Sequence, residues 1–173
     1  MKLKTITLSL LVTLSLSALT VGATPKTVTI EGDNGGLVKE DGAAWHSTML
    51  KNKVSVMFYV DPDEKDTNSH FSAALKEKNY NRTNYRSLAI INLAATWKPN
   101  FAIESVLKEK QVEFPDTIYV KDKKSVLVKE WEIADDASNI LIFSKNGTLL
   151  FYKSGAMSKD DMATAFNLIE NNL

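Results

Sequence analysis

The chain has 173 residues and no cysteine, which excludes thiol nucleophiles, thiol–disulfide exchange and cysteine-held metal or iron–sulfur centres. Lys and Arg together number 21, as do Asp and Glu, so the chain lacks the excess positive charge that binding to nucleic-acid phosphates requires. The length is typical of one domain with a core of its own.

The N-terminus has the three parts of a secretion signal. Lys2 and Lys4 form a short basic region, residues 6–19 are apolar with interspersed Ser and Thr, and residues 21–23 (VGA) are small enough for cleavage. The apolar part is short for a transmembrane helix.

We therefore expect cleavage between Ala23 and Thr24, which removes residues 1–23 and leaves one domain over residues 24–173. The expected location is the periplasm, with no membrane contact after cleavage. An uncleaved N-terminal anchor is the alternative.

The first half of the chain centres on a buried strand. A glycine-rich turn at residues 32–36 predicts a β-hairpin over residues 27–39. Residues 45–50 then carry apolar positions at helical spacing, with Trp45 as a cover for the core. Residues 54–60 (VSVMFYV) are nearly all apolar, which predicts a central strand covered on both faces.

An acidic segment, residues 61–66 (DPDEKD), follows this strand and precedes an amphipathic helix over residues 67–78. In open α/β sheets, binding sites form past the carboxyl end of a strand, at the start of the next helix. The acidic segment is therefore the first place to look for a site.

The second half predicts a strand, a helix, two strands joined by an Asn-Gly turn, and a last helix that begins at a capping box. These elements span residues 87–94, 100–110, 139–143, 148–152 and 158–171. An inserted segment, residues 112–137, holds a strand candidate at 117–120 and a partly alternating run at 126–133.

The resulting α/β order, β-α-β-α-β-β-α, matches the thioredoxin fold, with the first two strands parallel and the last two a hairpin. The N-terminal hairpin and the insertion resemble the peroxiredoxin and TlpA-like branch of that fold. The resemblance implies redox cysteines at positions occupied here by Asp63 and Asp66, and a cis-proline at the position of Ser138. A disulfide oxidoreductase and a cysteine peroxidase are therefore excluded.

Several blocks of sequence resemble the YtfJ family of periplasmic proteins, and their order and spacing are more specific than any one of them. These blocks are residues 32–39, 54–60, 95–100 (ATWKPN), 114–122, 129–131 and 141–158. The resemblance implies a thioredoxin-like fold, no established reaction and no cofactor. Some labels for the family describe a transcriptional regulator, which the secretion signal and the balanced charge disfavour.

The acidic segment has three interpretations. Acidic side chains in a first helical turn complement the helix dipole and cap the helix. The same oxygens, from Asp61, Asp63, Glu64 and Asp66, are weak candidates for a calcium site, but the segment lacks the glycine and the late glutamate of an EF-hand loop. Asp63 and Asp66 could act as an acid–base pair if their pKa values were pushed apart, and His70 is placed to hydrogen-bond Asp66.

A second polar loop, residues 96–100, follows the second parallel strand and should reach the same edge of the sheet. The side chains expected to share this rim are Asp61, Asp63, Asp66, Trp97, Asn100 and Ser138. The sequence favours a non-catalytic binding or accessory module that uses the rim for a periplasmic protein or peptide. The first alternative is a cysteine-free metal- or carboxylate-dependent enzyme, and the second is a transcriptional regulator. The rim could also be an ancestral cleft that this protein no longer uses.

Overall fold

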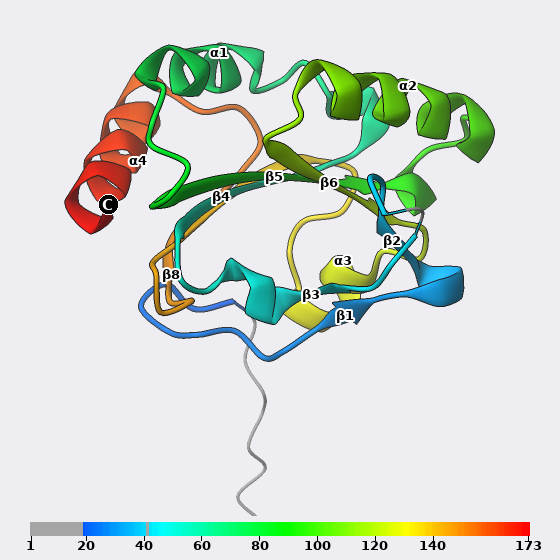
Figure 1. Cartoon of the computed structure of the whole chain (residues 1–173), viewed down its shortest axis with the longest axis horizontal. Coiled ribbons are helices and arrows are strands. Elements are labelled where there is room, and N and C mark those ends of the chain that lie inside the picture. Colours follow the sequence, from blue (N-terminus) through cyan, green and yellow to red (C-terminus); the bar gives the residue numbers. More distant parts are fainter. Residues whose placement is uncertain (1–18, 41) are drawn as a thin grey trace, which may run out of the picture.

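A six-stranded mixed sheet crosses the middle of the molecule and has helices on both faces (Figure 1). The computed structural model describes residues 19–40 and 42–173. The strands are β1 (Thr29–Ile30), β2 (Gly35–Leu37), β3 (Trp45–His46), β4 (Val54–Val60), β5 (Tyr85–Asn92), β6 (Thr117–Asp122), β7 (Ser138–Phe143) and β8 (Leu149–Ser154). The helices are α1 (Ser69–Lys78), α2 (Asn100–Glu113), α3 (Val126–Trp131) and α4 (Lys159–Asn172).

Strand β4 lies inside the sheet, whose order is β2-β6-β5-β4-β7-β8. It runs parallel to β5 and antiparallel to β7. Val54 and Val56 point into a core shared with α1 and α4, whereas Met57 and Tyr59 point into a second core shared with α3. Because side chains alternate across a strand, an almost uniformly apolar run is what a strand between two cores requires.

The predicted order of the thioredoxin-like elements is confirmed. The first two strands of that core are parallel, β7 and β8 form an antiparallel hairpin, and α4 begins at the predicted capping box of Ser158 and Asp161. The segment at 112–137 supplies β6, which extends the sheet beside β5, and α3, which covers the face opposite α1 and α4 (Figure 1).

The predicted hairpin over residues 27–39 is wrong, because its two halves pair with distant strands. β1 pairs with β3 in a separate two-stranded sheet, and β2 pairs with β6 at the edge of the main sheet. Gly35 shows why this segment needs a glycine, because a Cβ at that position would lie 1.8 Å from the backbone oxygen of Lys121. The glycine-rich segment thus permits a close approach to β6 instead of a hairpin turn.

Two shorter segments also differ from their sequence patterns. Residues 45–50 form β3 and then a 3-10 helix, although Trp45 is fully buried, as a cover for the core should be. The run at 126–133 forms α3 because the buried carboxylate of Asp122 accepts hydrogen bonds from the amides of Val126 and Leu127, at 2.9 and 3.1 Å. This caps the helix, and Leu127 and Trp131, four residues apart, then face the core.

The predicted secretion signal falls largely outside the described residues, since its basic region and most of its apolar region precede residue 19. From residue 19 onward, leaving aside residue 41, no helix is both long and apolar enough to cross a membrane.

Candidate functional site

The acidic loop begins where β4 ends. Asp61 is the N-cap of a short 3-10 helix, Pro62–Glu64, and its Oδ1 accepts the amide of Asp63 at 2.8 Å. This cap belongs to the 3-10 turn, with proline in its usual place at the first helical position. The predicted cap for the helix expected over residues 67–78 is wrong, because α1 begins only at Ser69 after Asn68 and has no acidic residue in its first turn.

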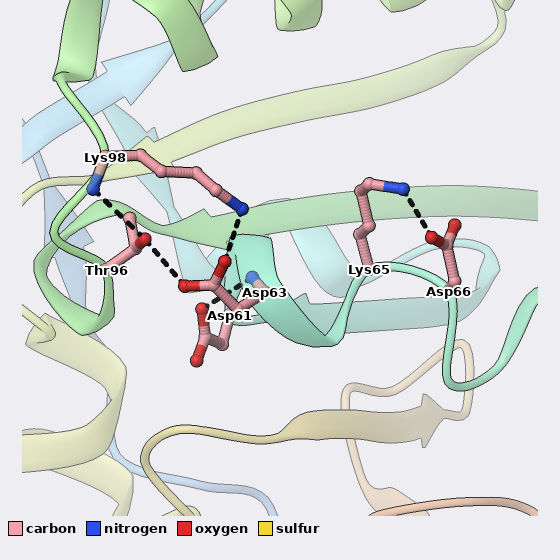
Figure 2. A network of polar contacts seen from close by, with 6 residues as sticks. All are labelled: Asp61, Asp63, Lys65, Asp66, Thr96 and Lys98. Carbon is pink, nitrogen blue, oxygen red and sulfur yellow. Dashed lines mark hydrogen bonds and ion pairs between the residues drawn. The ribbon is translucent and has the colours of Figure 1, made fainter.

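Asp63 links the acidic loop to the loop after β5. Its carboxylate accepts the hydroxyl of Thr96 at 2.8 Å and forms an ion pair with the ammonium group of Lys98 (Figure 2). The predicted convergence of these two loops at one edge of the sheet is confirmed by these contacts. The hydrogen bonds from Lys98 and Thr96 hold the pKa of Asp63 below its usual range.

Asp61 lies in a different environment from Asp63, although the two are close together in Figure 2. Asp61 is only 5% exposed to solvent. Burial raises the pKa of Asp61 above its usual range. The hydrogen bond from the Asp63 amide lowers the pKa in part, and the nearby carboxylates of Asp63, Asp136 and Glu64 raise it further. Two neighbouring carboxyl groups therefore have pKa values shifted in opposite directions, as an acid–base pair requires. They are Asp61 and Asp63, however, and not the expected pair of Asp63 and Asp66.

Asp66 and His70 do not join this cluster. Asp66 forms an ion pair with its neighbour Lys65 and lies away from Asp61 and Asp63 in Figure 2. The predicted hydrogen bond between Asp66 and His70 is wrong, because His70 Nε2 donates instead to the Met157 carbonyl at 3.0 Å. Glu64 accepts the hydroxyl of Thr67.

A metal site has no geometric support in the acidic loop. Over residues 19–40 and 42–173, no three His, Asp or Glu side chains come together in a group that could hold a metal ion. Asp63 is already neutralised by Lys98, and Asp66 by Lys65. Residual charge for a cation would have to come from Asp61 and Glu64.

Two large aromatic side chains stand in solvent next to the Asp63–Lys98 ion pair. Trp97 is 87% exposed and Phe101, in the first turn of α2, is 78% exposed. Asn100 is the first residue of α2 and is also exposed. Trp97 and Asn100 were expected on the rim from the sequence, whereas Phe101, in the first turn of α2, was not.

Ser138 lies at the expected edge of the sheet, opposite Val60 at the end of β4, but its side chain is buried there instead of being presented to solvent. Ser138 is only 2% exposed, and its hydroxyl accepts the side-chain amide of Asn68 at 3.0 Å. Asn68 also donates to the Gly155 carbonyl at 3.0 Å and accepts the Met157 amide at 2.9 Å. Asn68 thereby joins the start of α1, the start of β7 and the loop before α4 behind the rim. No periodic pattern in the sequence indicates this role.

A second set of polar contacts, buried at Tyr59 and Asp122 and partly buried at Asn92 and Asp135, holds the loops from the other core. Tyr59 donates its hydroxyl to Asp122 at 3.1 Å, and Asn92, at the end of β5, donates to Asp135 at 2.7 Å. The second contact ties the start of the Trp97 loop to the loop before β7. A buried and satisfied contact such as that of Tyr59 with Asp122 fixes backbone geometry.

The chemical capacity of the rim follows from these groups. It presents carboxylates, one paired ammonium group and two exposed aromatic rings, with no thiol. The rim lies apart from a small cavity of about 40 Å³ between the N-terminal segment and Trp131. Such a surface suits binding, and it cannot carry out thiol–disulfide chemistry.

Solved structures with the same architecture include proteins described as a thiol:disulfide interchange protein and a thioredoxin. A candidate thiol:disulfide interchange protein DsbE from Chlorobium tepidum has a TM-score of 0.61 and 12% identity, and the match covers 88% of this chain and 98% of that one. BsSco, a member of the Sco family of cytochrome c oxidase assembly proteins, has a TM-score of 0.58 and 10% identity, over 90% and 98% of the two chains. Fold and site together define a thioredoxin-like protein without a redox thiol.

The sequence relatives identify the family within this class. The profile of the family described as "Bacterial protein of unknown function (YtfJ_HI0045)" matches residues 22–172, and the chain belongs to the YtfJ family. An uncharacterized protein of Haemophilus influenzae is 29% identical over 129 residues, 72% of this chain and 70% of that protein. The uncharacterized protein YtfJ of Escherichia coli is 21% identical over 129 residues, 73% and 70% of the two chains.

Proposed function

We propose that the protein is secreted to the periplasm, where it acts as a non-catalytic binding module and holds a protein or peptide partner at the rim formed by the loops after β4 and β5. The observation that carries this proposal is the exposure of Trp97 and Phe101 beside the Asp63–Lys98 pair. Aromatic residues are enriched at protein interfaces and dominate their binding energy.

The charge of the surrounding loops favours one kind of partner. Asp61, Glu64 and Asp136 supply carboxyl groups at this edge, beside Asp63, whose charge is already neutralised by Lys98. An exposed tryptophan ring also attracts cations as well as apolar side chains. The occupant that this chemistry favours is an extended peptide segment with basic and apolar side chains.

The test compares three forms of the protein in intact cells. After chemical crosslinking, complexes are recovered from the wild type, from Trp97→Ala with Phe101→Ala, and from Val112→Ala. Val112 is a matched control because it is 83% exposed and lies at the far end of the same helix. Loss of a central aromatic contact costs about 2 kcal/mol or more, so we expect binding to be more than tenfold weaker in the double variant and unchanged in Val112→Ala.

Equal recovery of complexes from the wild type and the aromatic variant would contradict binding at the rim. Higher salt should weaken the wild-type complex, since the proposed attraction between carboxylates and basic side chains is screened. Fractionation of the cells tests the location: recovery in the cytoplasm would contradict the proposed secretion and revive the regulator as a candidate.

A carboxylate-dependent enzyme is the second candidate, and the divergent pKa values of Asp61 and Asp63 favour it. Divalent cations are the simplest probe. A ligand that binds only the folded state raises its stability, by about 2.7 kcal/mol at a hundredfold excess over the dissociation constant. We expect no change in melting temperature with calcium, magnesium, manganese or zinc; a shift that Asp61→Asn abolishes would favour the enzyme.

A further inference from the structure

The segment just before the expected cleavage point is attached to the folded domain. The amide of Gly22 donates to the Leu149 carbonyl at 2.8 Å, and the amide of Leu149 donates to the Ala23 carbonyl at 2.9 Å. Both backbone polar groups of Leu149, the first residue of β8, are therefore satisfied by residues that the sequence pattern assigns to the secretion signal. These bonds join parts of the chain more than a hundred residues apart.

Leu19 provides a second attachment. Its amide donates to the carbonyl of Trp131 at 3.3 Å, and its side chain packs, partly buried, against the core that contains Trp131. Between the two attachments the chain turns, with the Ala23 amide donating to the Thr20 carbonyl at 3.1 Å and Gly22 at a φ of 92°. That φ favours glycine, so the local sequence fits the turn.

We propose that residues 19–23 stay in the mature protein and that the leader is cut off before Leu19 instead of after Ala23. The inference rests on the proposed secretion. Hydrolysis of one peptide bond there consumes one water molecule and leaves a carboxylate on the leader and an α-ammonium group on the mature chain. Cleavage after Ala23 would instead remove both partners of the Leu149 backbone and uncover the core beneath Leu19.

The sequence allows the earlier cut. Ser15 and Ser17 place small residues three and one before the bond to Ala18, and Ala18 places a small residue directly before Leu19. Residues 6–14 remain as an apolar stretch of suitable length. The family profile also starts at residue 22, ahead of Thr24, so the part of the chain that the family shares includes Gly22 and Ala23.

The test is to produce the whole chain with its own leader, recover it from the periplasm, and determine its N-terminal sequence and intact mass. We expect Ala18 or Leu19 as the first residue. A first residue of Thr24 would overturn the inference and leave the proposed secretion intact. A full-length chain in the cytoplasm would overturn both, so the two failures are distinguishable.

Variants at the two cleavage points provide a second test, in which the measured quantity is whether the leader is removed. Ala23→Phe places a large residue directly before the later bond, at an exposed position, and should leave processing unchanged. Ser17→Phe combined with Ala18→Phe does the same at the earlier bonds and should cause loss of processing and accumulation of the precursor. The reverse pattern, with processing lost only in Ala23→Phe, would overturn the inference.

Discussion

At the scale of single residues, Asp61 and Asp63 show how two neighbouring carboxyl groups acquire opposite properties from their surroundings. Asp63 is bonded by Lys98 and Thr96, which favours its ionised form, whereas burial of Asp61 favours its protonated form. Their effects on folding differ in sign. The stabilisation from Asp63 is present above the ordinary carboxyl pKa and is lost as the pH falls through the lowered value, whereas ionised Asp61 opposes folding until the pH falls through its raised value.

We predict that these two titrations can be separated by a single substitution. Lys98→Met should return the pKa of Asp63 toward its ordinary value and leave the pKa of Asp61 raised, because burial is the main cause there. The measurement is an NMR titration of the side-chain carboxyl carbons. Lys65→Met is the control, since Lys65 pairs with Asp66 and should leave both titrations unchanged. Identical midpoints for Asp61 and Asp63 in the wild type would contradict this description of the site.

Asn68 is the residue whose loss should most disturb the support of the rim. It is 3% exposed and makes three side-chain hydrogen bonds, to Ser138, Gly155 and Met157. Truncation leaves buried polar groups unpaired, so Asn68→Ala should lower the free energy of unfolding by about 2–3 kcal/mol. Urea denaturation measures the change. Asn171→Ala, at an exposed position, should change it by less than about 0.5 kcal/mol; equal effects of the two would contradict the assigned role of Asn68.

At the scale of elements, local patterns predicted those elements whose stabilising contacts are local or follow from periodicity. The apolar run of β4, the Asn146–Gly147 turn of the β7–β8 hairpin and the capping box of α4 are of this kind. Elements whose contacts leave no periodic pattern in the sequence were missed. Gly35 of β2 allows a close approach to Lys121 of a distant strand, and α3 depends on a cap from Asp122, four residues before the helix.

The candidate site was predictable in outline for a similar reason. Two parallel strands place the loops that follow them at one edge of a sheet, which brought Asp61, Asp63 and Trp97 together. The orientation of each side chain is not set by that rule. Ser138 therefore proved to be buried under Asn68, and His70 bonded to Met157 instead of Asp66.

Residues 19–23 offer a stability prediction at the same scale. A chain that begins at Thr24 lacks the two backbone hydrogen bonds to Leu149 and the contact of Leu19 with the core. At about 0.5–1.5 kcal/mol for each hydrogen bond, its free energy of unfolding should be about 1–3 kcal/mol lower than that of a chain beginning at Leu19. Thermal unfolding of the two forms tests this, and equal melting temperatures would show that the segment adds no stability.

At the scale of the whole molecule, the chain combines a thioredoxin-like fold with the absence of cysteine. The overall fold matches solved structures with TM-scores near 0.6, yet the loop after β4 carries Asp63 and Asp66 at the positions where the resemblance to the thioredoxin fold implies redox cysteines. A fold by itself does not set function. Two exposed aromatic rings lie beside that loop. They are the main reason for proposing that the protein uses this edge as a binding surface.

The most direct test is photocrosslinking in living cells from single positions on the surface. A photoreactive amino acid is placed at Trp97, at Phe101 or, as the control, at Val112, all exposed in the folded protein. Binding at the rim predicts the same discrete crosslinked partner from positions 97 and 101 and none from position 112. No crosslink from either rim position, or the same products from all three, would contradict it.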